Sequence, residues 1–124
     1  MPILNVQISQ GSSALQKTAL LQKMTQAVVD SVGAPLASIR IVLQEVPPEH
    51  VMVAGEIGKE MALVTANLIE GRTDALKAAL IAALANAIEQ ATGISTQNVR
   101  VVLYDIPKTD LGVAGGRTAL AAGR

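Results

Sequence analysis

Four short stretches of the chain are rich in β-prone residues, which indicates strands. They run from Ile3 to Ser9, Ile39 to Val46, Leu63 to Ile69 and Val99 to Ile106. In the first stretch the even-numbered residues are aliphatic, whereas Asn5 and Gln7 between them are polar. Such a two-residue period is typical of a strand with one buried face, because successive side chains point to opposite sides of a sheet.

Between the strands of each pair, hydrophobic residues recur at helical spacing. The stripes are Leu20, Met24, Ala27 and Val28 in the first segment, and Leu80, Leu84, Ala87 and Ile88 in the second. Ser13, with Gln16 three residues later, predicts a capping box at the start of the first helix. Thr73 is the natural N-cap of the second helix. Gly33 and Gly93 are expected to end the two helices.

The second half of the chain repeats the first at a constant offset, without a gap. The matched residues include Gly11 and Gly71, Gly33 and Gly93, Arg40 and Arg100, Pro47 and Pro107, and Gly55 and Gly115. Each half reads as strand, helix, strand, and so short a crossover predicts parallel strands. We therefore expect an α/β (α+β) fold with one four-stranded sheet and two helices on one face. Residues 1–124 would form a single domain of two fused βαβ repeats, 2–61 and 62–124.

This arrangement leaves the other face of the sheet without a helical cover, although every strand places apolar residues on it. Half of the 124 residues are hydrophobic, and the mean hydropathy is +0.41. A unit of about 60 residues buries only about 60% of its unfolded surface, so neither repeat is stable by itself. We expect further copies of the chain to cover the open face.

Composition excludes several functions. A formal net charge of zero and a pI near 6.6 provide no basic surface for nucleic acid, and a single aromatic residue provides no stacking platform. The chain has no cysteine and one histidine, His50, so we expect no metal site. No apolar run reaches the roughly 18 residues that span a bilayer. We expect a cytoplasmic protein with no membrane partner.

Several motifs together resemble 4-oxalocrotonate tautomerase of the tautomerase superfamily. They are the opening Met1–Ile3, the Gly-Arg-Thr-Asp run from Gly71 to Asp74, the stretch from Ala34 to Ile41, His50, and the run from Ala54 to Glu56. The resemblance extends over essentially the whole chain, once per copy. It implies a tautomerase/MIF-like fold in a fused protein, where one chain replaces a dimer of short subunits. It also implies a homotrimer and an isomerase that needs no cofactor.

The resemblance implies that Pro2 is the central catalytic residue. The family uses an amino-terminal proline, which is exposed by removal of Met1, as a general base. An α-amino group has a reference pKa of about 7.7–8.0, and apolar walls with a nearby arginine would lower that pKa further. A neutral Pro2 could then move a proton on a small 2-hydroxy-dienoate or 2-oxo acid, such as 2-hydroxymuconate or phenylenolpyruvate. Ala62 takes this position in the second copy, so we expect one catalytic amine per chain.

The resemblance also implies that two arginines from neighbouring subunits bind the substrate's carboxylates. The position after the first strand is Arg72 in the second copy but Ser12 in the first. The position at the start of the second strand is Arg40 in one copy and Arg100 in the other. Arginine suits this task because its planar guanidinium can form two parallel hydrogen bonds to one carboxylate. The candidate substrate-binding residues are therefore Arg72, Arg40 and Arg100.

Two other functions are compatible with the sequence. Tyr104 together with Asp105, Asp110 or Glu45 could mimic the water-activating pair of the cis-3-chloroacrylic acid dehalogenases, which would make the protein a hydratase or dehalogenase. Two βαβ-like repeats also describe ferredoxin-like modules, which bind effectors or other chains without catalysis. At the end of the chain, the glycines from Gly112 to Gly116 predict tight turns. We expect Ala119 to Arg124 to be a frayed end.

Overall fold

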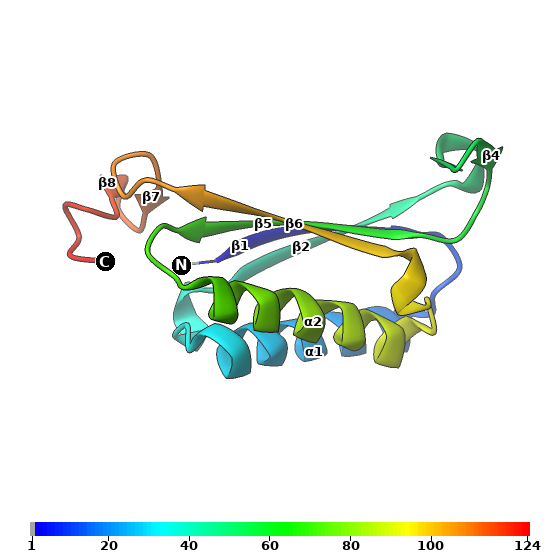
Figure 1. The fold of residues 1–124 in the computed structure, drawn as a ribbon, viewed down its shortest axis with the longest axis horizontal. Helices are drawn as coiled ribbons and strands as arrows, with labels where there is room; N and C mark the ends of the chain where they lie inside the picture. The colour runs from blue at the N-terminus through cyan, green and yellow to red at the C-terminus, as the bar shows by residue number, and fades with distance from the viewer. Residues whose placement is uncertain (1) are drawn as a thin grey trace.

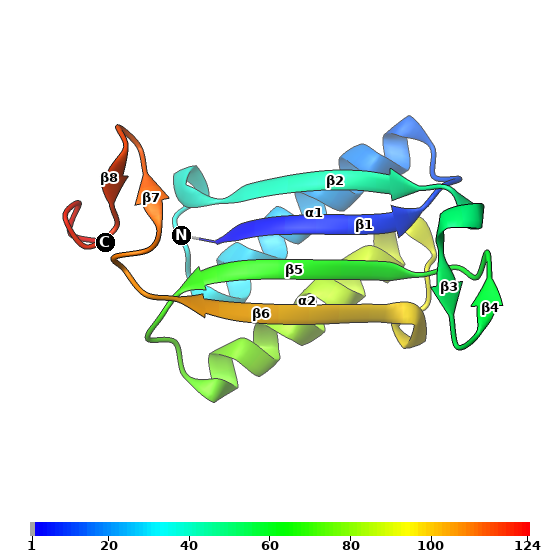
Figure 2. The ribbon, with the colours of Figure 1, turned by 90° about the horizontal axis from the view of Figure 1, so that it is seen from above.

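A computed structural model describes residues 2–124 of the chain. Four strands form one sheet in the order β2 (Arg40–Val46), β1 (Ile3–Ser9), β5 (Ala62–Ile69) and β6 (Val99–Ile106), as Figure 2 shows. The helices α1 (Ala14–Val32) and α2 (Asp74–Thr92) lie side by side on one face of this sheet (Figure 1). This confirms the expected fold class.

The pairing of the strands relates the two βαβ units by an approximate two-fold axis. β1 is parallel to β2 and β5 is parallel to β6, whereas the central strands β1 and β5 are antiparallel. Val6 lies opposite Val64 near the middle of the central pair. Because the two units run in opposite directions, equivalent positions of the two copies lie at opposite ends of the sheet.

The helices begin and end where the sequence predicts. The Ser13 hydroxyl accepts a hydrogen bond from the backbone N–H of Gln16 at 3.1 Å, and the Gln16 side chain accepts one from the Ser13 N–H at 2.8 Å. At the start of α2, the Thr73 hydroxyl accepts a hydrogen bond from the backbone N–H of Leu76 at 3.2 Å. Gly33 adopts φ 67° at the end of α1, a left-handed conformation that favours glycine.

The main core lies between the helices and the sheet. It is built from aliphatic side chains, as the absence of Phe and Trp requires. Its fully buried members include Leu4, Val6, Ile8, Leu20, Met24, Val28, Val64, Leu68, Leu80, Leu84 and Ile88. Each such side chain contributes about 1.5–3 kcal/mol relative to leaving it exposed.

Short elements extend both ends of the sheet. The hairpin β3 (Met52–Val53) and β4 (Glu56–Ile57) lies at one end, and the hairpin β7 (Gly112–Val113) and β8 (Arg117–Thr118) lies at the other, near the amino terminus (Figure 2). Three 3-10 turns, η1 (Leu36–Ser38), η2 (Pro48–His50) and η3 (Thr96–Asn98), complete the connections.

The segment from Ala119 to Arg124 is packed, so the expectation of a frayed end is wrong. Ala119 has no exposed surface and belongs to a second small cluster with Ile69 and Leu111. The Ala119 N–H donates to the Leu111 carbonyl at 2.8 Å, and the Arg124 N–H donates to the Ala119 carbonyl at 2.9 Å. Burial of one small side chain and these backbone bonds hold the segment against the sheet.

The second face of the sheet carries no helix in this chain (Figure 1). It is mixed rather than apolar: Val42, Leu63, Val102 and Tyr104 are exposed there, beside polar residues of the central strands. The Gln7 amide donates to the Gln44 side chain across β1 and β2 at 3.3 Å. Among the described residues, neither helix is long and apolar enough to cross a membrane.

Candidate active site

A cleft of about 310 Å³ lies at the end of the sheet where β1 begins. Its walls come from the loop after α1, the turn between β5 and α2, the loop after β6, and the end of the chain. The lining residues are Pro35, Ser38, Ile69, Glu70, Arg72, Lys108 and Arg124. Residues from both copies of the repeat therefore meet in one site.

Pro2 lies directly beside this cleft. Its side chain is fully buried, and its carbonyl accepts a hydrogen bond from the Arg40 N–H at 3.1 Å. Ile3 pairs with Arg40 on one side and Asn67 on the other, so continuing the register by one residue places Pro2 between Ile39 and Leu68. Ser38 and Ile69, which are adjacent in sequence to Ile39 and Leu68, both line the cleft. Met1, on whose removal the proposed chemistry depends, lies outside the described residues.

Arg72 is the candidate arginine that shares the cleft with Pro2 in the same chain. It occupies the turn between β5 and α2, directly before the N-cap Thr73. Its Nη1 donates to the Ile69 carbonyl at 3.0 Å, which fixes the guanidinium at the cleft wall. The remaining N–H groups of Arg72 and the positive end of α2 favour a negatively charged ligand there.

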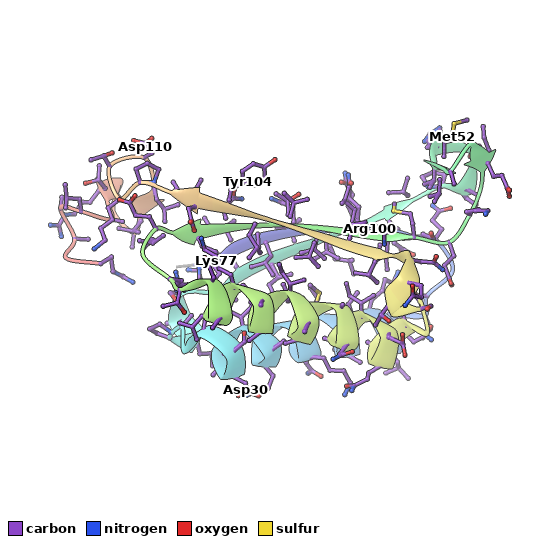
Figure 3. The ribbon with its side chains drawn as sticks, in the orientation of Figure 1. Asp30, Met52, Lys77, Arg100, Tyr104 and Asp110 are labelled. Carbon is purple, nitrogen blue, oxygen red and sulfur yellow. The ribbon has the colours of Figure 1, made fainter. Side chains whose placement is uncertain are left out.

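Arg40 and Arg100 do not line this cleft. Each uses its Nη1 to donate to two backbone carbonyls, those of Ala37 and Ile39 for Arg40. Both lie on outer strands of the sheet, on the same open face as the exposed Val42 and Val102. Arg40 lies at the Pro2 end of the sheet, whereas Arg100 lies at the opposite end (Figure 3). Within a single chain, Arg72 therefore lines the cleft beside Pro2, Arg40 contacts Pro2 through its backbone without lining the cleft, and Arg100 lies at the other end of the sheet.

Two cations of the cleft, Lys108 and Arg124, were not identified from the sequence. Lys108 lies in the loop after β6, and Arg124 belongs to the packed final segment. Neither belongs to a motif, and their proximity to Pro2 depends on chain packing, so no local signal could have found them. Arg117, in the hairpin before the final segment, donates from Nη2 to the Ala121 carbonyl at 2.6 Å.

The opposite end of the sheet has a smaller and differently charged cleft. It measures about 220 Å³ and lies around Ala62, the equivalent of Pro2. Arg100 and Glu60 are the charged side chains that line it. Ser12 stands at the position of Arg72, so the two ends of the chain offer different chemistry.

Two of the acidic residues proposed for dehalogenation, Asp105 and Glu45, do not face Tyr104. Tyr104 is 53% exposed on the open face (Figure 3), whereas its neighbour Asp105 is on the other face and forms an ion pair with Lys77. Glu45 forms the equivalent ion pair with Lys17 at 2.8 Å. The hydrogen bond from Lys17 holds the pKa of Glu45 below its ordinary value of 4.5. Both carboxylates connect a helix to an outer strand rather than facing the tyrosine.

Within residues 2–124, no three His, Asp or Glu side chains gather closely enough to hold a metal ion.

Comparison with known proteins assigns the chain to a family. The model of the tautomerase family, described as tautomerase enzymes, matches residues 2–60 and again residues 63–121. The 2-hydroxymuconate tautomerase of Pseudomonas putida is 39% identical over 61 residues, which cover 49% of this chain and 97% of that protein.

Solved structures extend the similarity to the whole chain. A fused 4-oxalocrotonate tautomerase (4-OT), described as a wild-type symmetric trimer, is 57% identical to this chain in sequence. The two structures superpose with a TM-score of 0.97, and the match covers 98% of this chain and 99% of the other. A protein solved after inactivation by 2-oxo-3-pentynoate is 43% identical with a TM-score of 0.96 and the same coverage. Macrophage migration inhibitory factor of Toxoplasma gondii, 21% identical, shares the fold with a TM-score of 0.82, covering 94% of this chain and 98% of that one.

The double match and the full-length structural similarity exclude a purely ferredoxin-like binding module. The chain belongs to the tautomerase family and is an isomerase similar to 4-oxalocrotonate tautomerase.

Proposed function

We propose that the protein is a cofactor-independent tautomerase in which Pro2, freed by removal of Met1, is the general base. The observation that carries this proposal is the position of Pro2 at the head of β1, beside a cleft that Arg72 lines. β1 runs away from the cleft. The backbone nitrogen of Pro2 comes before its carbonyl group along the chain, so the nitrogen lies nearer the cleft. The amine and the guanidinium therefore serve one site.

In the proposed reaction, the neutral amine of Pro2 takes the hydroxyl proton of a 2-hydroxy-dienoate. The C2–O bond becomes a carbonyl, the double bonds shift along the chain, and the same proton is delivered to a carbon of the product. Arg72 and the positive end of α2 disfavour a charged amine, which keeps the base neutral near physiological pH. The Arg72 guanidinium also stabilises the negative charge that develops on the substrate during transfer.

The cleft suits small, acidic substrates. About 310 Å³ is at the lower end of the range for small-molecule sites, roughly 300–1,000 Å³. We propose 2-hydroxymuconate or phenylenolpyruvate as substrates, in line with the 2-hydroxymuconate tautomerases to which the chain is similar. Inactivation of a related protein by a 2-oxo acid with a triple bond agrees with this substrate class.

We also propose that the active form is a homotrimer. Similar fused 4-OT structures are described as symmetric or asymmetric trimers. The open face carries Val42, Leu63 and Val102 exposed, and a trimer would cover them. Arg40 or Arg100 of a neighbouring chain would then complete the Pro2 cleft. Because Ala62 replaces the proline in the second copy, the trimer would hold three sites rather than six.

Replacing Pro2 with alanine tests the mechanism. The secondary amine becomes a primary one and the ring is lost, so we expect kcat/KM for ketonisation of 2-hydroxymuconate to fall by 10²-fold or more, the lower range for general-base catalysis. The decay of the dienol absorbance measures the rate, and mass spectrometry of the wild type reports whether Met1 is absent.

A second variant separates the amine from the ring. A short amino-terminal extension keeps Pro2 but converts its nitrogen into an amide, and it should abolish activity to a similar extent. Full activity in either variant would show that Pro2 is not the base.

A further inference from the structure

The Pro2 cleft contains two cations that the proposed proton transfer does not need. Lys108 follows β6 and Arg124 lies in the final packed segment, so both come from the last part of the chain. The equivalent of Lys108 in the first copy is Pro48, which carries no charge, and Arg124 lies beyond the part of the chain that the family model matches. The two cations therefore mark the end of the sheet that also has Pro2.

Specific contacts hold both residues at the cleft. The Leu120 N–H donates to the Lys108 carbonyl at 3.1 Å, which joins the loop after β6 to the final segment. Arg117 binds the Ala121 carbonyl, and the Arg124 N–H binds the carbonyl of the fully buried Ala119. The backbone that bears the two cations is thus fixed by hydrogen bonds and by the small apolar cluster beneath it.

The side-chain charges of the cleft do not balance. Arg72, Lys108 and Arg124 contribute three positive side-chain charges and Glu70 contributes one negative charge, so positive charge predominates even when the α-carboxylate of Arg124 is counted. The salt bridges among residues 2–124 involve other residues, so these three cations are not paired with acidic side chains. A negatively charged ligand is complementary to such a site.

We propose that Lys108 and Arg124 bind the second carboxylate of a dicarboxylate substrate, while Arg72 binds the first. The two residues then determine specificity by favouring dicarboxylates over monocarboxylates. This inference rests on the proposed function, because it assumes that substrate occupies the Pro2 cleft. It adds that the final segment, rather than the repeated βαβ units, sets the charge of the site.

Binding of two unreactive acids tests the inference without catalysis. Adipate has two carboxylates, and hexanoate has one on a carbon chain of the same length. Titration calorimetry measures the affinity of each acid for the wild type, Lys108→Gln, Arg124→Gln and the double variant. We expect the double variant to bind adipate about tenfold more weakly and hexanoate with little change, because charge-assisted hydrogen bonds at a partly open site contribute modestly. Lys23→Gln, which removes a charge on the outer side of α1, should bind both acids like wild type.

Unchanged adipate affinity in the double variant, equal losses for both acids, or undetectable adipate binding by the wild type would each overturn the inference. Thermal unfolding of the variants identifies any that fail to fold, and the single variants then provide the comparison. Kinetics distinguish the two proposals. If Pro2→Ala abolishes activity but the double variant keeps the wild-type KM for 2-hydroxymuconate, the specificity role fails and the proposed function stands. If Pro2→Ala stays active, the mechanism fails, and the binding comparison still decides the role of the two cations.

Discussion

Individual residues distinguish the two ends of an otherwise repeated chain. Arg72 and Ser12 occupy the same position in the two copies, directly after the first strand of each unit. Arg72 lines the cleft beside Pro2, whereas Ser12 lies at the end that has Ala62. Of these two equivalent positions, only the one beside the candidate amine thus carries a guanidinium.

Removing this guanidinium should weaken substrate binding. For Arg72→Gln we expect KM for 2-hydroxymuconate to rise roughly tenfold to hundredfold, because a hydrogen bond to a charged group contributes about 1.5–3 kcal/mol. Steady-state kinetics measure the change. Ser12→Ala, the matched control at the other end, should leave KM unchanged, and equal effects of the two variants would contradict the assignment.

At the scale of elements, each helix is connected to the outer strand of its own unit by an ion pair. Lys17 of α1 pairs with Glu45 of β2, and Lys77 of α2 pairs with Asp105 of β6. Both pairs are partly exposed, so each contributes modestly and is weakened by salt. Their repetition follows from the duplication of the sequence.

The Lys17–Glu45 pair predicts a pH-dependent contribution to stability. The pKa of Glu45 is lowered in the folded protein, so its contribution is fully present above its ordinary value of 4.5 and is lost as the pH falls through the lowered pKa. Glu45→Gln should therefore reduce Tm slightly at pH 7, and the difference from wild type should shrink toward pH 3. Thermal unfolding followed by circular dichroism measures both. Glu49→Gln, at an exposed position of η2, should follow the wild type at each pH.

At the scale of the whole molecule, antiparallel pairing of β1 with β5 joins two short units into one sheet. The helices cover one face, and the other face keeps exposed hydrophobic side chains such as Val42 at 60% and Val102 at 41%. Polar residues occupy the centre of that face, which fits a surface that other chains cover through both apolar and hydrogen-bonded contacts.

Light scattering tests the proposed trimer. The wild type should have three times the chain mass of 12.8 kDa. Val42→Glu should reduce the mass toward that of one chain, because an unpaired carboxylate between subunits costs several kcal/mol. Leu15→Glu, at an 84% exposed position in the first turn of α1, provides the control and should keep the mass of the wild type. A single-chain mass for the wild type, or a trimer that tolerates Val42→Glu, would contradict the proposal.

Much of the fold could be predicted because its signals are local. The alternation around Asn5 and Gln7, the capping box of Ser13 and the glycine at position 33 all depend on residues close in sequence. The candidate site was predictable in part. Arg72 was found through a motif, whereas Lys108 and Arg124 were missed because cations in loops have no periodicity and no fixed partner.

The sequence alone determined the duplication, the four strands, the two helices and the candidate amine Pro2, since each depends on short-range spacing or on a motif. The tertiary structure decided which side chains share the cleft. It placed Arg72, Lys108 and Arg124 at one end of the sheet, and it separated Tyr104 from Asp105 across two faces. The physical reason is the antiparallel pairing of β1 with β5 and the docking of the final segment. Both bring together residues that are far apart in the chain, and both depend on long-range packing rather than local pattern.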